Sequence, residues 1–213
     1  MNNDEAYAQG LLNKALDPAT QPQAIRSFLR AESALLRELI PRGSRVVDFG
    51  CGMGRHLITL DDHVGLGVGF DYEATYIAEA VKLAADAPHL HFFVGDATAV
   101  PLTTVFDMAV CLSNTWGTMS DKSVVFQEMK RLSPQRGSRL ITVYAPSSVP
   151  ARSEWYANMG HDVLDATDQR IVASGGFTSE HFTSEHFTED RLRGLLGPCE
   201  LHTIGDIAYV AQC

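Results

Sequence analysis

Apolar and polar residues alternate along this chain with two different periods, which predicts helices and strands in turn. Residues 22–40 carry apolar side chains at helical spacing between acids and arginines, so they predict an amphipathic helix that Pro41 ends. Short apolar runs beyond it predict strands buried on both faces, as in a parallel sheet. The predicted strands lie directly before Gly50 and at 64–71, 90–96, 105–112 and 137–145. The predicted helices lie at 56–62, 73–87, 121–132 and 189–196, with Ser120 and Thr188 as the N-caps of the last two. A closing antiparallel pair of strands is predicted at 200–204 and 207–212. This alternation is typical of an α/β fold.

Composition fits one enzyme domain. The chain has 213 residues, 45% hydrophobic and 20% charged, which is enough for one buried core and short for two domains. No apolar run approaches the roughly 20 residues of a membrane helix, and residues 1–5 lack the basic and apolar parts of a signal peptide. We therefore expect a cytoplasmic protein with no membrane partner. A net charge of −9 also argues against nucleic acid as a partner.

The cysteines form no Cys-x-x-Cys pair, so the sequence predicts neither a zinc site nor a disulfide framework, in keeping with a cytoplasmic location. They are Cys51, Cys111, Cys199 and Cys213.

The most informative stretch runs from Val46 to Arg55, VVDFGCGMGR. An apolar strand ending in an acid leads into glycines at every second position, where the backbone can approach a ligand closely because no side chain blocks it. The spacing is Gly-x-Gly-x-Gly and not the Gly-x-Gly-x-x-Gly of dinucleotide-binding folds, which disfavours a nicotinamide dehydrogenase.

Two later strands also end in an acid, Asp71 and Asp96. Together with Asp48, they would meet at the carboxyl edge of a parallel sheet, where open α/β sheets bind ligands. Any single acid there could be only a turn former, but three in register with the glycines indicate a binding site.

This pattern resembles the class I S-adenosylmethionine-dependent methyltransferases, most strongly over residues 46–114. The resemblance implies a doubly wound, Rossmann-like seven-stranded sheet, mostly parallel with a C-terminal antiparallel hairpin. It implies that Asp71 binds the ribose, that Asp96 contacts the adenine amine, and that Asp48 orients the glycine loop and the methionine amino group. The cofactor contacts implied are Asp48, Gly50, Cys51, Gly52, Gly54, Arg55, Asp71, Tyr72, Asp96, Ala97, Leu112 and Ser113.

Residues 146–187 form a long segment between the last parallel strand and the final helix, and we expect a loop-like lid over the substrate. Its aromatic residues, among them Trp155, Tyr156 and Phe177, either face the substrate or form a small core of their own. The stretch Thr178–Phe182 repeats directly as Thr183–Phe187, TSEHF twice. The five-residue offset matches neither a strand nor a helix face, so no metal site is predicted.

Candidate catalytic residues are few, because S-adenosylmethionine is already a strong methyl donor and positioning supplies much of the acceleration. His181 and His186 are candidate bases. After the fourth strand, Asn114 is a further catalytic candidate, and Trp116 is a substrate candidate along with Trp155 and Tyr156. The Asn-Pro-Pro-Tyr signature of amino-group methylation in nucleic acids and glutamine is absent.

The sequence thus predicts one domain spanning 1–213, acting as a monomer or homodimer on a small-molecule acceptor through oxygen or nitrogen, with S-adenosylhomocysteine as the second product. Its parts are a helical cap (1–42), a cofactor core (45–145), a lid (146–187) and the last helix with its hairpin (188–213). Two alternatives remain open: an RNA or protein methyltransferase, and a protein that binds S-adenosylmethionine without transferring the methyl group.

Overall fold

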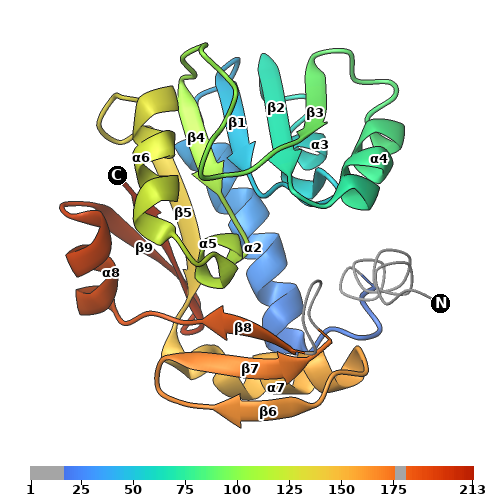
Figure 1. Ribbon diagram of the computed structural model, residues 1–213, viewed down its shortest axis with the longest axis vertical. Helices are drawn as coiled ribbons and strands as arrows, with labels where there is room; N and C mark the ends of the chain where they lie inside the picture. The colour runs from blue at the N-terminus through green and yellow to red at the C-terminus, as the bar shows by residue number, and fades with distance from the viewer. Residues whose placement is uncertain (1–16, 176–180) are drawn as a thin grey trace.

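A seven-stranded sheet in the order β3-β2-β1-β4-β5-β10-β9 forms the centre of the computed structural model, which describes residues 17–175 and 181–213 (Figure 1). The pairings from β3 to β5 are parallel, and β10 is antiparallel to both β5 and β9, as the sequence predicts. The strands are β1 (Arg45–Phe49), β2 (Leu66–Asp71), β3 (Leu90–Val94), β4 (Met108–Cys111), β5 (Arg139–Tyr144), β9 (Glu200–Ile204) and β10 (Ala208–Gln212). No helix in the described ranges is long and apolar enough to cross a membrane.

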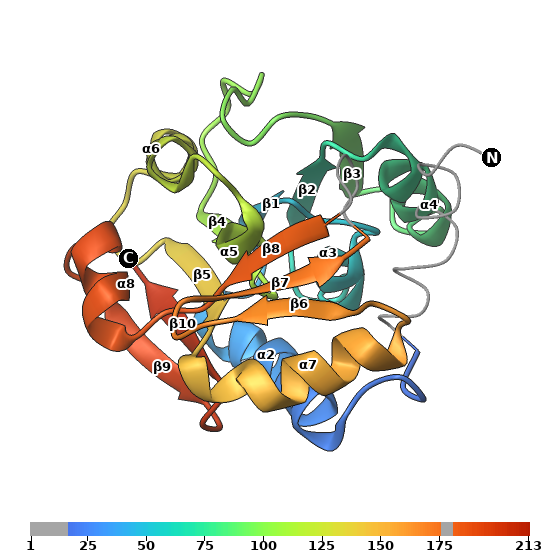
Figure 2. The ribbon, with the colours of Figure 1, turned by 60° about the horizontal axis from the view of Figure 1, so that its bottom comes forward.

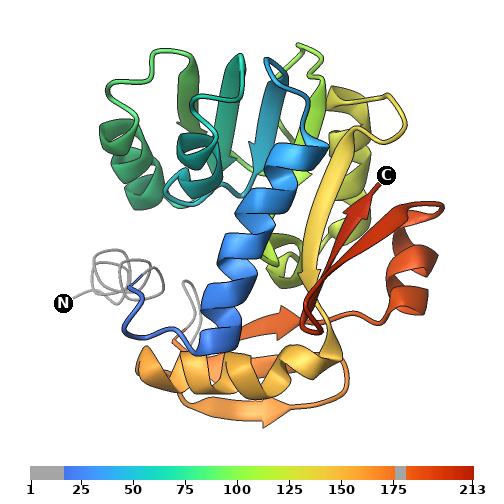
Figure 3. The ribbon, with the colours of Figure 1, turned by 180° about the vertical axis from the view of Figure 1, so that it is seen from behind.

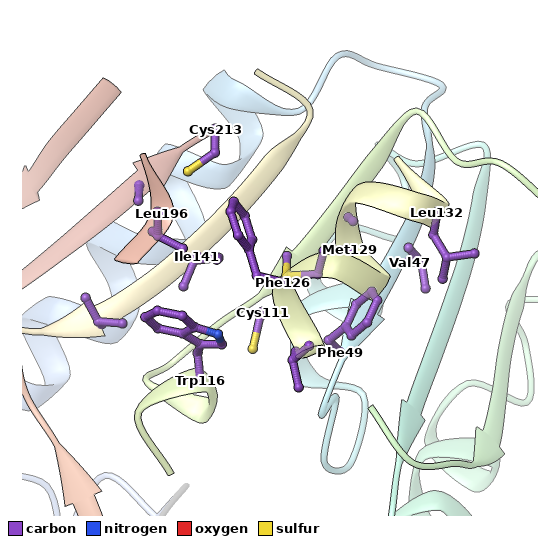
Figure 4. Packing of buried hydrophobic residues seen from close by; sticks show 14 of the residues in the cluster. Val47, Phe49, Cys111, Trp116, Phe126, Met129, Leu132, Ile141, Leu196 and Cys213 are labelled. Carbon is purple, nitrogen blue, oxygen red and sulfur yellow. The ribbon is translucent and has the colours of Figure 1, made fainter. Parts of the chain in front are cut away.

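Helices cover both faces of this sheet. On the face seen in Figure 3 lie α2 (Gln23–Leu39), α3 (Arg55–Thr59) and α4 (Ala74–Leu83), and on the other lie α6 (Lys122–Leu132) and α8 (Glu189–Leu196). Alternate residues of β1 serve the two layers: Val46 packs in the α2 and α3 layer, whereas Val47 and Phe49 pack in the layer shown in Figure 4. Asp48 follows the period of Val46 and therefore points into the α2 and α3 layer.

Two of the predicted helices end earlier than expected: the helix predicted at 56–62 ends at Thr59, and the one predicted at 73–87 ends at Leu83. Thr188 caps α8 by accepting a hydrogen bond from the backbone N–H of Arg191, and Gly197 follows this helix with a φ of 81°. The prediction of Ser120 as the N-cap of α6 is wrong, because Asp121 occupies that position.

The sequence analysis predicts a loop-like lid at 146–187, but the described residues of this segment, 146–175 and 181–187, fold into a small module. It contains a short 3-10 turn (Pro146–Ser148), α7 (Val149–Asn158) and an antiparallel sheet of β6 (Val163–Ala166), β7 (Arg170–Ser174) and β8 (His181–Glu185). The module has its own core, formed by Tyr156 of α7, by Met159 directly after that helix, and by Ile171 and Ala173 of β7. It lies beyond the carboxyl ends of the parallel strands, with β8 next to the short helix α5 (Thr115–Thr118) and α7 packed on β6 and β7 (Figure 2). Phe177 and the start of the first TSEHF copy, Thr178–Glu180, lie outside the described residues.

The expectation that the chain forms no disulfide is also wrong. Cys199 and Cys213 form a disulfide, with their Cα atoms 4.4 Å apart. The cause is the hairpin register: Glu200 pairs with Gln212, so the residues just outside this pair face each other. The cysteines therefore give no support to a reducing compartment.

Candidate functional site

The glycine loop between β1 and α3 is the centre of the site. Gly50, Gly52 and Gly54 have φ values of 70°, 54° and 77°, a left-handed backbone that other residues rarely adopt. A Cβ on Gly54 would lie 2.7 Å from the ring of Phe92, and one on Gly50 would collide with the side chain of Thr115. The loop can therefore lie against β3 and α5 only because these residues have no side chain.

Asp71, at the end of β2, holds the loop from the adjacent strand. Its Oδ2 accepts from the backbone N–H of Gly52 at 3.0 Å, and its Oδ1 accepts from that of Glu73 at 3.0 Å. Each carboxylate oxygen has a second lone pair, so two further donors can be accepted. The backbone thus orients a carboxylate that still has acceptor capacity at the carboxyl edge of the sheet.

Asp48 is buried behind the loop, and neither of its oxygens has a hydrogen-bond partner among the described residues. Nδ1 of His56 lies 3.9 Å from Oδ2 of Asp48. Burial, followed by the negative charge of Glu32, raises the pKa of Asp48 from 3.8 to about 8. An unsatisfied buried carboxyl group is costly to the fold and indicates a binding role.

Glu32, in the middle of α2, is a central site residue that the sequence analysis missed. It is fully buried, and it accepts hydrogen bonds from Nη2 of Arg55 at 2.9 Å and from both the backbone N–H (2.8 Å) and the hydroxyl (2.7 Å) of Ser113. His56 Nε2 lies 3.1 Å from the same carboxylate. Burial opposes ionisation, but His56, Arg55 and Ser113 hold the pKa of Glu32 well below its usual range.

The two buried acids therefore differ in charge at neutral pH: Glu32 is ionised and Asp48 is protonated. Burial and the adjacent Arg55 lower the pKa of His56, and the Glu32 carboxylate opposes this shift. This cluster connects α2 to the glycine loop and to the end of β4.

Sequence comparison identifies the domain. Residues 46–137 match the methyltransferase domain family. This match includes the glycine loop and the strands β2 to β4, so the part of the chain that carries the candidate cofactor site is similar to a methyltransferase domain. No curated protein matches it in sequence.

Solved structures share the fold of this methyltransferase at low sequence identity. The PH0226 protein from Pyrococcus horikoshii is 19% identical, with a TM-score of 0.68 over 97% of this chain and 96% of that one. An S-adenosylmethionine-dependent methyltransferase from Methanosarcina mazei is 18% identical, with a TM-score of 0.61 over 83% and 94%. The S-adenosylmethionine-bound amino pentose methyltransferase CalS10 from Micromonospora echinaspora is 15% identical, with a TM-score of 0.54 over 90% and 92%.

The residues of the site fit S-adenosylmethionine. The cofactor carries an ammonium group, which an unsatisfied buried acid such as Asp48 can bind, and ribose hydroxyls, which can donate to Asp71. Because the glycines of the loop carry no side chain, the loop backbone between Asp48 and Asp71 can approach the cofactor closely.

The other predicted cofactor residues lie in varied environments. Asp96 is exposed and its Oδ1 accepts from the backbone and hydroxyl of Thr98, which lowers its pKa. Tyr72 is 59% exposed beside Asp71, whereas Cys51 and Leu112 are buried and Ala97 is partly buried.

Asn114 and Trp116 both make contacts that join parts of the fold. The side chain of Asn114 donates to Ser184 Oγ (3.0 Å) and to the carbonyl of Glu185 (3.1 Å), and it accepts from the backbone N–H of Tyr144 (3.0 Å). It thereby fastens β8 to β5. Trp116 is buried in the α6 layer (Figure 4), and its ring packs against that of Phe187.

The histidine and aromatic candidates belong to the module and the residues that directly follow β8. His186 is buried, with Nδ1 3.3 Å from Nη1 of Arg152, and burial together with that cation lowers its pKa. His181 is exposed on β8, and Trp155 and Tyr156 pack with the module core. In residues 17–175 and 181–213, no group of three or more His, Cys, Asp or Glu is placed to hold a metal ion.

Gly52→Val tests the loop. A valine at a φ of 54° is strained, and its side chain would occupy the cradle, so we expect loss of S-adenosylhomocysteine binding in a protein that still folds. Isothermal titration calorimetry and circular dichroism measure the two properties. Normal binding by a folded Gly52→Val variant would show that the loop is not the cradle.

Asp48→Asn tests the protonated acid. The unfolded chain loses this proton near pH 4 and the folded protein near pH 8, so stability falls as the pH rises between these values. Asparagine does not titrate. We therefore expect the free energy of unfolding of the variant, relative to wild type, to increase by roughly 2–4 kcal/mol from pH 4 to pH 8. Urea unfolding at the two pH values measures this difference, and parallel profiles would contradict it.

Proposed function

We propose that this methyltransferase methylates oxygen or nitrogen of a small-molecule acceptor. The observation that carries the proposal is the folded module over the carboxyl edge of the sheet (Figure 1). It is fastened to the core through Asn114, and Asn158 of α7 donates to the carbonyl of Thr20 before α2 at 2.8 Å. A site covered in this way favours a small acceptor over an extended surface.

Two further observations support a small acceptor. The net charge of −9 disfavours a polyanionic substrate such as RNA. The fold is shared with CalS10, a methyltransferase of an amino pentose, although a shared fold alone does not assign a substrate.

The chain would act chiefly by binding and positioning. Asp71 would hold the ribose, Asp96 the adenine amine, and Asp48 the amino group of the cofactor, which supplies an electrophilic methyl group when bound. The positive charge of the cofactor's ammonium group beside Asp48 would lower the pKa of that acid. Cofactor binding near neutral pH would therefore release the proton of Asp48. The module and α2 would exclude water from the reacting atoms.

A base is required only for an acceptor that is protonated at the working pH. His186 is neutral near pH 7 because of its lowered pKa, but its contact with Arg152 places it in the module. A base role for His181 or His186, and an acceptor role for Trp155 or Tyr156, stay predictions.

The deciding experiment measures S-adenosylhomocysteine formation by purified protein supplied with S-adenosylmethionine and a small-molecule metabolite extract, with Asp71→Ala as the control variant. We expect formation that depends on the extract and is lost in the variant. Formation only with RNA or protein fractions would support the alternative acceptors. Cofactor binding with no turnover on any fraction would indicate a protein that binds without transferring the methyl group.

A further inference from the structure

A groove of about 400 Å³ runs along α2, between the segment that precedes this helix and the start of α3. Its lining includes Gln21, Arg26, Arg30, Ser33 and Arg55. Three of the lining residues are arginines and none is acidic, although the chain has 26 acidic and 17 basic side chains. The groove therefore has a charge opposite to that of the protein as a whole.

Two arginines of α2, Arg26 and Arg30, are not neutralised by carboxylates of the described residues, whereas Arg37 of the same helix pairs with Asp62. Arg26 donates through Nη1 to the carbonyls of Pro18 (3.0 Å) and Gln21 (2.7 Å), which hold its side chain in place without cancelling its charge. Arg30 is exposed and makes no ion pair or hydrogen bond with any residue that the structure describes. Being four residues apart, the two lie on one face of the helix, an arrangement that is unfavourable unless an anion bridges it.

Arg55 connects this groove to the glycine loop. It directly follows Gly54, and its Nη2 donates to Glu32 and to the hydroxyl of Ser113, at 2.6 Å for the latter. Ser113 lies two residues after the end of β4, which is the strand next to β1. An anion bound by Arg26 and Arg30 would thus lie next to the cofactor site and not on a remote part of the surface.

We propose that Arg26 and Arg30 bind the anionic group of the methyl acceptor, a carboxylate or a phosphate. The planar guanidinium fork suits both anions, because it donates two parallel hydrogen bonds. This inference rests on the proposed methyl transfer to a small molecule, and it restricts that acceptor to acidic compounds. The carboxylate of the cofactor is the other anion that could occupy the groove, and the experiment separates the two sources.

The direct probe is inorganic phosphate, titrated into the full chain while the arginine side-chain Nε–H resonances are followed by NMR. We expect the resonances of Arg26 and Arg30 to shift, and we expect Arg26→Ala/Arg30→Ala to weaken phosphate binding at least fivefold. The matched control is Arg42→Ala/Arg136→Ala, which removes two exposed arginines outside the groove. Absence of shifts at Arg26 and Arg30, or equal phosphate binding by both double variants, would overturn the proposal.

Two further measurements assign the anion to the acceptor. The extract is divided by ion exchange into anionic and other fractions, and we expect turnover with the anionic fraction, with KM raised at least tenfold in Arg26→Ala/Arg30→Ala. We expect the affinity of that variant for S-adenosylhomocysteine to match wild type. A loss of that affinity would assign the arginines to the cofactor, and turnover confined to neutral, cationic or polynucleotide fractions would overturn an acidic acceptor. If no fraction is turned over, the proposed function fails and the acceptor assignment falls with it, whereas phosphate binding still decides whether the groove binds anions.

Discussion

Replacing Asp71 by alanine is expected to weaken S-adenosylhomocysteine binding roughly ten- to a hundred-fold, because hydrogen bonds to a charged acceptor contribute about 1.5–3 kcal/mol. Two effects add in this variant. The ribose loses its acceptor, and the backbone N–H of Gly52 loses the carboxylate that holds the loop. Isothermal titration calorimetry gives the affinity, and circular dichroism confirms that the variant is folded.

Asp71→Asn and Asp86→Ala make this test specific. Asparagine keeps the shape and one acceptor oxygen, so we expect an intermediate loss, whereas Asp86 is an exposed acid after α4 whose removal should leave binding unchanged. Unchanged affinity in a folded Asp71→Ala protein would remove Asp71 from the cofactor site.

The cofactor half of the site could be predicted from sequence because its determinants are local. A strand, a glycine turn and a helix are contiguous from Val46 to Thr59, and the rule that parallel strands share a carboxyl edge brings Asp71 and Asp96 to the same place. The seven-stranded order follows from the same alternation of elements, with the terminal hairpin recognisable by its Gly205-Asp206 turn.

Glu32 could have been found but was not. On α2 it lies on the stripe of buried residues formed by Ile25, Phe28 and Leu36, at helical spacing from each. An acid in the middle of an apolar stripe requires a buried partner. Its partners Arg55, His56 and Ser113 are 23 to 81 residues away in sequence, so no local pattern names them.

The module at 146–187 and the disulfide were missed for related reasons. Strands of four and five residues give a weak alternation signal, and the core of the module depends on α7 packing against β7. The cysteines were judged by spacing along the chain, whereas their pairing follows from the register of the predicted hairpin. In both cases the structure depends on how segments pair and pack in three dimensions, which spacing along the sequence does not show.

Replacing Glu32 by alanine is expected to destabilise the protein by about 3–5 kcal/mol, the usual cost of removing one partner from a buried ion pair. The variant leaves the guanidinium of Arg55 and the imidazole of His56 without their carboxylate, and it leaves the backbone N–H of Ser113 without an acceptor. Since the same groups join α2 to the glycine loop, cofactor affinity should fall as well. Urea unfolding at pH 7 measures the stability and calorimetry the affinity.

Glu32→Gln and Glu38→Ala separate charge from shape. Glutamine retains one acceptor oxygen but adds two donors that face Arg55, so we expect it to recover less than half of the lost stability. Glu38 is an exposed acid on the same helix, and its alanine variant should stay within about 0.5 kcal/mol of wild type. If Glu32→Ala were as stable as Glu38→Ala, the buried cluster would not be what joins α2 to the cofactor loop.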